Sequence, residues 1–212
     1  MQSAPTATPT LPTATPAAPG SQGVEKTVTL TASRDAPLFV GSPDSNHTGD
    51  PNLFVGRTRM GDVRRAMVAF DISGAIPAGS KIKSVKLRMS VDKTHPGGQP
   101  VGLHRITAEW AESASWNNRQ PGVKWAKGGG DFAATASATT NVSGQLQGLF
   151  PQVWDSAGLS ADVQGWLDAP ATNAGWVLIG AEGLDQSVKR FASREASDVN
   201  SRPTLIVTFT AP

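Results

Sequence analysis

The feature that most constrains the fold is the alternation of apolar and polar residues in VKLRMSV, residues 85–91. Val85, Leu87 and Met89 occupy every second position, and Lys86 and Arg88 lie between them. Because side chains along a β-strand point alternately to its two faces, this pattern predicts a strand with one buried face and one face in water. Lys86 and Arg88 are therefore expected to share the exposed face.

Short β-prone segments recur along the rest of the chain, and most are bounded by Gly, Pro, Asn or Asp. They are TVTLT (27–31), LFV (38–40), LFV (53–55), AMVAF (66–70), VGLHRI (101–106), WVLI (176–179) and LIVTF (205–209). Many strands with long polar connections indicate an all-β antiparallel sandwich. At 38% hydrophobic residues the chain can build one sizeable core, and with no cysteine it does so without disulfides.

One short helix is predicted between the last strands. Its apolar stripe consists of Leu159, Val163, Trp166 and Leu167. The spacing of these residues places them on one face of a helix. Ser160 or Asp155 is expected to cap the helix, and Pro170 is expected to end it.

The first twenty residues are nearly all Ala, Pro and Thr. A segment of this composition cannot bury enough surface to offset the entropy lost on ordering. We therefore expect a disordered Pro/Thr-rich linker over residues 1–23 and one folded domain over residues 24–212. Pro/Thr linkers are typical of extracellular multidomain proteins, in which they join a module to its neighbours or to the cell surface.

A set of motifs follows one another in a characteristic order. They are RAMVAFDIS (65–73), IPAGSKI (76–82), EWAE (109–112), SWNN (115–118), FASRE (191–195) and RPTLIVTF (202–209). Over residues 29–209 this order resembles the DNRLRE domain, a secreted jelly-roll module grouped with the family 96 carbohydrate-binding modules. The resemblance implies a jelly-roll sandwich that binds an alginate-like polysaccharide without catalysis and holds a larger secreted or surface protein on its substrate.

The charged residues of these motifs fit a structural role better than a ligand-binding one. Arg65, Asp71, Arg194 and Glu195 flank strands and are expected to form an ion-pair network at the rim of the sandwich. The carboxylates of the EWAE segment are likewise expected to be structural. Of the six tryptophans, Trp110, Trp116, Trp154 and Trp166 stand at family-like positions and are interpreted as packing residues.

A run of basic residues is the first candidate ligand site. Residues 57–88 contain eight basic and two acidic side chains, a local charge of +6 against +2 for the whole chain. Lys86 and Arg88 share one strand face, and neighbouring strands are expected to add Arg57 and Arg59. Such a groove suits the carboxylates of an anionic glycan, since Arg and carboxylate form paired hydrogen bonds. The alternative is an ordinary solvated face.

The second candidate is an aromatic platform in PGVKWAKGGG, residues 121–130. Trp125 lies in this glycine-rich loop beside Lys124, and we expect its indole ring to be exposed. Sugar rings pack their C–H faces on tryptophan. The alternative is that Trp125 is simply a core residue.

The loop DSNHTGD, residues 44–50, resembles the first half of a calcium loop. Asp44, Asn46, Thr48 and Asp50 are the candidate ligands of a structural Ca²⁺. The bidentate glutamate that closes such loops is missing, because Val55 stands at its position. The alternative is a turn held by Asx hydrogen bonds.

Other functions find less support in the sequence. The net charge is low and no nucleic-acid motif is present, so no nucleic-acid partner is expected. No apolar run approaches 18 residues, so no membrane insertion is expected. The three histidines share no metal-ligand spacing, which argues against an enzyme. A structural or adhesive surface subunit that assembles through protein contacts is the alternative function.

Overall fold

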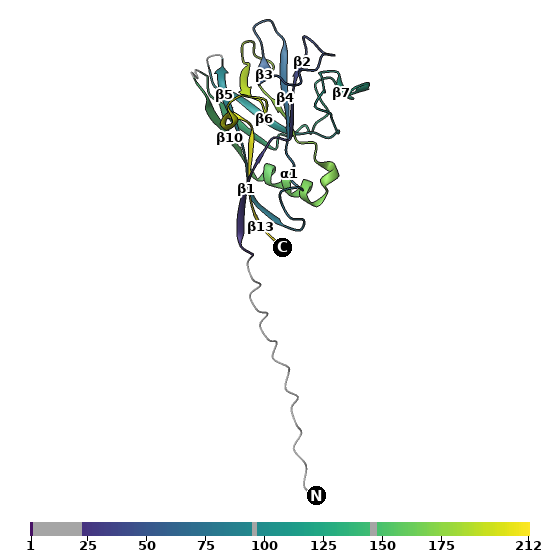
Figure 1. Ribbon diagram of the computed structural model, residues 1–212, viewed down its shortest axis with the longest axis vertical. Helices are drawn as coiled ribbons and strands as arrows, with labels where there is room; N and C mark the ends of the chain where they lie inside the picture. The colour runs from purple at the N-terminus through teal and green to yellow at the C-terminus, as the bar shows by residue number, and fades with distance from the viewer. Residues whose placement is uncertain (2–22, 95–96, 145–147) are drawn as a thin grey trace.

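The computed structural model describes residues 1, 23–94, 97–144 and 148–212. Nearly all of the expected linker, residues 1–23, and His95 lie outside the described residues. The described part is a β-sandwich with one α-helix (Figure 1). Its strands are β1 (Glu25–Thr31), β2 (Arg34–Phe39), β3 (Asn52–Arg57), β4 (Val63–Ala69), β5 (Lys81–Thr94), β6 (Gln99–Arg105), β7 (Asn118–Gln120), β8 (Val123–Lys124), β9 (Ala138–Val142), β10 (Phe150–Asp155), β11 (Trp176–Ile179), β12 (Lys189–Ala192) and β13 (Thr204–Thr210).

Eleven of these strands form one large antiparallel sheet that curls on itself, and β7 and β8 form a separate two-stranded sheet. Its order is β1-β13-β5-β12-β3-β4-β11-β6-β9, with β10 on the free side of β5 and β2 on β4. The half around β5 packs against the half around β11, and side chains from both halves form the main hydrophobic core. The predicted antiparallel jelly-roll sandwich is confirmed.

Strand β5 shows why the sequence folds in this way. Val85, Leu87 and Met89 are fully buried, whereas Lys86 is exposed and Arg88 is half-buried. The predicted alternation of β5 is therefore confirmed from Val85 to Met89, whereas Ser90, expected on the exposed face, is buried. Along this strand β13 pairs with the first part and β12 with the last part, on the same edge.

The helix α1 (Ala157–Asp168) packs against β5 (Figure 1), and all four residues of its predicted apolar stripe are buried. The predicted caps, Ser160 and Asp155, were both wrong, the second by one residue. Ser156 is the N-cap, and its hydroxyl oxygen accepts a 3.1 Å hydrogen bond from the backbone N–H of Leu159. The helix ends at Asp168 with Ala169 as its C-cap, and Pro170 begins a short 3₁₀ turn, as its missing N–H allows.

The two outer faces of the sandwich differ. A second hydrophobic cluster lies on the outer side of β2, β4 and β11, where Leu38, Met67 and Val177 pack against Trp110 and Trp125 from the excursion between β6 and β9. That face is therefore covered by the protein's own chain. The outer face of β3, β12 and β5 carries the open hollows described below.

The first and the last strand of the sandwich, β1 and β13, meet at one pole of the molecule. Glu25 of β1 lies opposite Thr210 of β13, and Thr210 lies opposite Lys81 at the start of β5. The end of β5 at Thr94 is the opposite pole, where β12 and β3 join the sheet.

Candidate functional site

Three side chains form a row across the outer face of the sheet at the Thr94 end of β5. Phe54 of β3 lies directly opposite Arg190 of β12, and Arg190 lies directly opposite Lys93 of β5. Leu53 and Val55, the neighbours of Phe54, are fully buried in the core. Because the faces alternate along a strand, Phe54 and its cross-strand partners point outward.

A β-bulge places an acidic residue beside this row. Phe191 pairs with Val91 and Arg190 pairs with Lys93, which leaves Asp92 as one extra residue in β5. Nε and Nη2 of Arg190 donate to the two carboxylate oxygens of Asp92, both at 2.7 Å. This bidentate pair raises the pKa of Arg190, so the guanidinium stays charged and is held in one orientation.

The row lines an open hollow of about 330 Å³, which Thr94 and Val188 complete. Lys93 is exposed, and it takes part in no ion pair with the described residues. The hollow therefore combines an aromatic ring, a fixed guanidinium and a solvated ammonium. This set of groups fits a polar ligand that has an apolar face and an acidic substituent.

Further aromatic contacts hold Phe54 in place. The ring of Phe39, at the end of β2, lies 5.9 Å from that of Phe54 in an edge-to-face arrangement. The guanidinium of Arg64 lies 3.9 Å above the Phe39 ring, and the His47 ring packs 4.3 Å from it. Desolvation by burial lowers the pKa of His47, which favours its neutral form at pH 7.

Two of the predicted ligand residues lie on the same outer face but outside this hollow. Lys86 pairs with Asp155 of β10 at 3.4 Å, with both side chains about half exposed. Nη1 of Arg88 donates to the backbone oxygen of Asn200 at 3.1 Å. The connection from β12 to β13 thus contacts β5 at Arg88.

Arg57 and Arg59 do not lie near Lys86 and Arg88. The single basic groove that the sequence predicts from these four residues is therefore wrong. Arg57 pairs with Asp185 at 2.8 Å, and Arg59 is exposed in the β3–β4 hairpin. The strand register puts Arg57 beyond the Thr94 end of β5, about 30 Å from Lys86 by strand rise. The four residues form no common groove because β3 pairs with β12, and β12 pairs with β5 only near Thr94.

The expected exposure of Trp125 is also wrong. Its side chain is only 5% exposed, and its indole N–H donates to the backbone oxygen of Ser115 at 2.9 Å. Trp125 packs in the cluster that covers β2, β4 and β11. Lys124 is exposed on β8, in the small hairpin with β7 on the far side of the molecule from β5 (Figure 1). The predicted packing of Trp110, Trp154 and Trp166 is confirmed.

The residues of the possible calcium loop bond to several different partners. Asp44 accepts hydrogen bonds from the side-chain amides of Asn117 and Asn118, at 3.0 and 3.1 Å. The Thr48 hydroxyl donates to the backbone oxygen of Glu112, and Asp50 accepts from the backbone N–H of Asn52. Asn46 is exposed.

Within the described ranges, no group of three or more His, Asp or Glu side chains has the geometry to hold a metal ion. Asp44, Thr48 and Asp50 thus make turn and inter-loop hydrogen bonds, which fits the alternative of a turn held by Asx hydrogen bonds.

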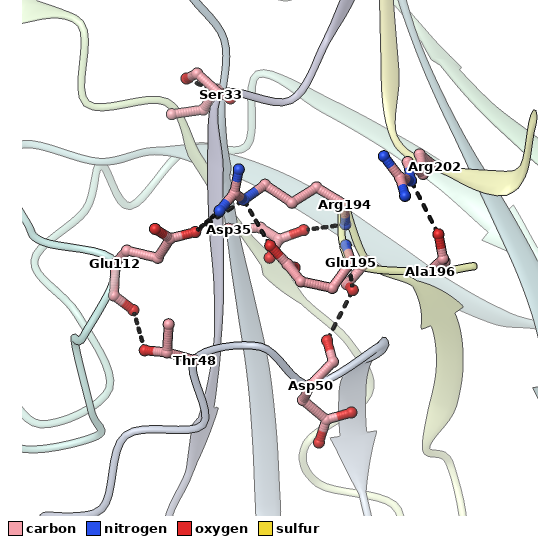
Figure 2. Close-up of polar contacts among 11 residues, drawn as sticks. Ser33, Asp35, Thr48, Asp50, Glu112, Arg194, Glu195, Ala196 and Arg202 are labelled. Carbon is pink, nitrogen blue, oxygen red and sulfur yellow. Dashed lines mark hydrogen bonds and ion pairs between the residues drawn. The ribbon is translucent and has the colours of Figure 1, made fainter. Parts of the chain in front are cut away.

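The motif residues form the expected structural network (Figure 2). Nε of Arg194 donates to Glu112 at 2.8 Å and pairs with Glu195 at 2.7 Å, and the backbone N–H of Arg194 donates to Asp35 at 2.7 Å. Arg65 makes a bidentate pair with Glu182, at 2.7 and 2.9 Å. These contacts confirm structural ion pairs for both arginines and for Glu195, with the Arg65–Glu182 pair separate from the contacts of Arg194.

Two other acidic residues of the motifs, Asp71 and Glu109, make contacts of their own. Asp71 stands apart from the network, because its carboxylate accepts from the backbone N–H of Gly74 in a turn. Glu109 pairs with Arg34 at 2.9 Å, so Glu109 and Glu112 bind different arginines in structural roles. Neither faces the hollow of Phe54.

The part of the chain that the structure describes holds no helix with the length and hydropathy of a membrane span.

Comparison with known proteins identifies the family. No curated protein matches the chain. The sequence model of carbohydrate-binding module family 96 matches residues 26–209, a range that runs from the start of β1 almost to the end of β13. The match therefore covers the whole sandwich, including the row on its outer face. The chain belongs to carbohydrate-binding module family 96.

Proposed function

We propose that this module binds an anionic, uronate-containing polysaccharide, such as alginate, in the hollow formed by Phe54, Arg190 and Lys93, and that it does so without catalysis. One observation carries the proposal, namely the cross-strand row that puts an aromatic ring and two cations on one open surface. The C–H face of a pyranose packs on an aromatic ring. The carboxylate of a uronate pairs with ammonium and guanidinium groups.

The surroundings of the row support binding rather than chemistry. Among the residues that line this hollow none is acidic, and the adjacent Asp92 is held in a bidentate pair by Arg190. A glycosidase-type reaction needs a pair of carboxyl groups across the scissile bond. The hollow offers no such pair within the described residues.

The proposed setting is extracellular. The Pro/Thr-rich composition of residues 1–23 suits a linker to a larger secreted or surface protein. The module would then raise the effective concentration of its neighbour at the polysaccharide. Assembly or adhesion through protein contacts is the alternative outcome of the tests below.

Calorimetric titration with alginate and with a neutral glucan of similar length tests the proposal. We expect the protein to bind alginate more tightly, with an affinity that falls as salt screens the charges. Lys93→Ala should weaken alginate binding roughly 10- to 100-fold, the loss typical of one charge-assisted hydrogen bond. Phe54→Ala should weaken it as well.

Lys124→Ala is the matched control, because it removes an exposed lysine on the far side of the molecule. It should bind alginate like the unmodified protein. Equal binding of both glycans, or full affinity in the Lys93→Ala variant, would exclude this hollow as a polyuronate site. Absence of any glycan binding, together with self-association in size-exclusion chromatography, would favour the adhesive alternative.

A further inference from the structure

A second hollow, of about 200 Å³, lies beside the first on the same face of the sheet. Asn52 of β3 and Ala192 of β12 lie opposite each other, each two residues along its strand from Phe54 and Arg190. Two residues along a strand correspond to about 7 Å on one face. The two hollows are thus consecutive along the strands, at a spacing comparable with one sugar residue of a chain.

The two hollows share a wall. Arg190 lines the first hollow and Asp92 lines the second, and these two side chains are joined by hydrogen bonds of 2.7 Å. A chain that lies across the face would therefore contact both hollows. The shared ion pair would separate the two sugar residues.

The chemistry of the second hollow is opposite to that of the first. Asp92 and Asp198 line it, and none of its lining residues is basic. Asp50 is close enough to raise the pKa of Arg190 by its charge, so a third carboxylate contributes to the same region. The rest of the lining includes the small side chain of Ala192, the exposed Leu149 and the amide of Asn52.

Resting on the proposed function, we propose that the two hollows are adjacent subsites with different preferences. The first takes a uronate, and the second takes a neutral sugar residue, so the preferred ligand alternates acidic and neutral residues. Carboxylates accept hydrogen bonds from sugar hydroxyls but repel a second carboxylate. A chain made only of uronates would place a negative charge against Asp198, whereas the charge of Asp92 is offset by its pair with Arg190.

Calorimetry with two acidic probes of matched length tests this preference. Alginate oligomers carry a carboxylate on every residue, and hyaluronan oligomers alternate glucuronate with neutral N-acetylglucosamine. We expect hyaluronan oligomers to bind roughly fivefold more tightly or better, a factor that one like-charge contact near a protein surface can supply. Lys93→Ala should weaken the binding of both.

Asp198→Asn is the informative variant. Asp198 is exposed, and its Oδ1 accepts a 3.0 Å hydrogen bond from the backbone N–H of Asn200 at the start of a 3₁₀ turn. Asparagine can make the same bond, so the turn should persist. Asp198→Asn should strengthen alginate binding about fivefold and leave hyaluronan binding unchanged. Asp168→Asn, at the end of α1, is the control that removes the same charge elsewhere.

The outcomes separate the two proposals. If neither acidic glycan binds, the proposed function itself is wrong. If Lys93→Ala weakens alginate binding but alginate binds at least as tightly as hyaluronan, the function stands and the preference of the second hollow is refuted. That preference is also refuted if Asp198→Asn changes alginate affinity no more than Asp168→Asn does.

Discussion

Asp35 of β2 accepts a 2.7 Å hydrogen bond from the backbone N–H of Arg194, in the connection from β12 to β13. The Asp35 side chain is buried, and it is also hydrogen-bonded to the carboxyl group of Glu195. Burial and the adjacent carboxylate of Glu195 together raise the pKa of Asp35 to about 7. The folded Asp35 carboxyl therefore stays protonated in mild acid beside Glu195, and its contacts with Arg194 and Glu195 link two segments distant in sequence.

Asp35→Asn should reduce the change in the free energy of unfolding between about pH 4 and pH 7. The pKa of Asp35 is raised on folding, so folded Asp35 holds a proton that the unfolded chain has already released. Its stabilising contribution is full below about pH 4 and is lost as the pH rises to about 7. Asparagine imitates the protonated form, since it can accept from Arg194 and donate to Glu195.

Urea unfolding between pH 4 and 8 measures this effect. The free energy of unfolding of Asp35→Asn should rise relative to that of the unmodified protein by roughly 2–4 kcal/mol across this range. Asp185→Asn, at an exposed aspartate, should run parallel to the unmodified protein. Parallel curves for Asp35→Asn as well would show that folded Asp35 is already ionised in mild acid.

Trp125→Ala should destabilise the fold without removing the ligand site. The side chain is buried among the residues that cover β2, β4 and β11, so its truncation should cost roughly 3–5 kcal/mol of unfolding free energy. Trp125→Phe should cost less, because it keeps most of the packed area. Alginate affinity, measured below the melting temperature of each variant, should not change. A selective loss of affinity in both variants would place the glycan on the other face.

Replacing Lys86 and Arg88 together with alanine should leave the melting temperature within about 2 °C, because exposed charges contribute little to stability. Both residues lie on the outer face of β5 but outside the hollow of Lys93. Short alginate oligomers should therefore bind normally, while long chains should bind more weakly at low salt because the local positive charge is reduced. Loss of short-oligomer binding here, with normal binding in Lys93→Ala, would move the site to the first half of β5.

Removing divalent cations with a chelator should not change the melting temperature. The oxygens of Asp44, Thr48 and Asp50 are already engaged in hydrogen bonds with other parts of the chain. A bound ion would stabilise the native state by mass action, and the melting temperature would then fall on chelation. A fall that Asp44→Ala abolishes would establish a calcium site in this loop.

The sequence predicts the sandwich well because alternation and turn residues are local signals. Strands that lack these local signals are harder to predict from the sequence. Strand β10 contains Pro151, which is tolerated only because β10 pairs on one side with β5, and β9 is mostly polar. Strand β12 is four residues long, and its lysine and arginine resemble a surface motif more than a strand.

The proposed site depends on pairing between strands far apart in sequence, and this is why sequence analysis missed it. Phe54, Lys93 and Arg190 become neighbours only through the register of β3, β12 and β5. One local signal was present, because Phe54 lies between two core residues and alternation turns it outward. The bulge at Asp92 has no comparable signature in the sequence.

The meeting of β1 and β13 at one pole of the sandwich also determines how the module faces its surroundings. Strand β5 runs from that pole to the hollows over 14 residues, or about 45 Å. A neighbour fused to either end of the sandwich would therefore be attached at the side remote from the hollows. Its bulk would not obstruct them, so the same module could serve neighbours of very different size while the proposed ligand-binding face stays accessible.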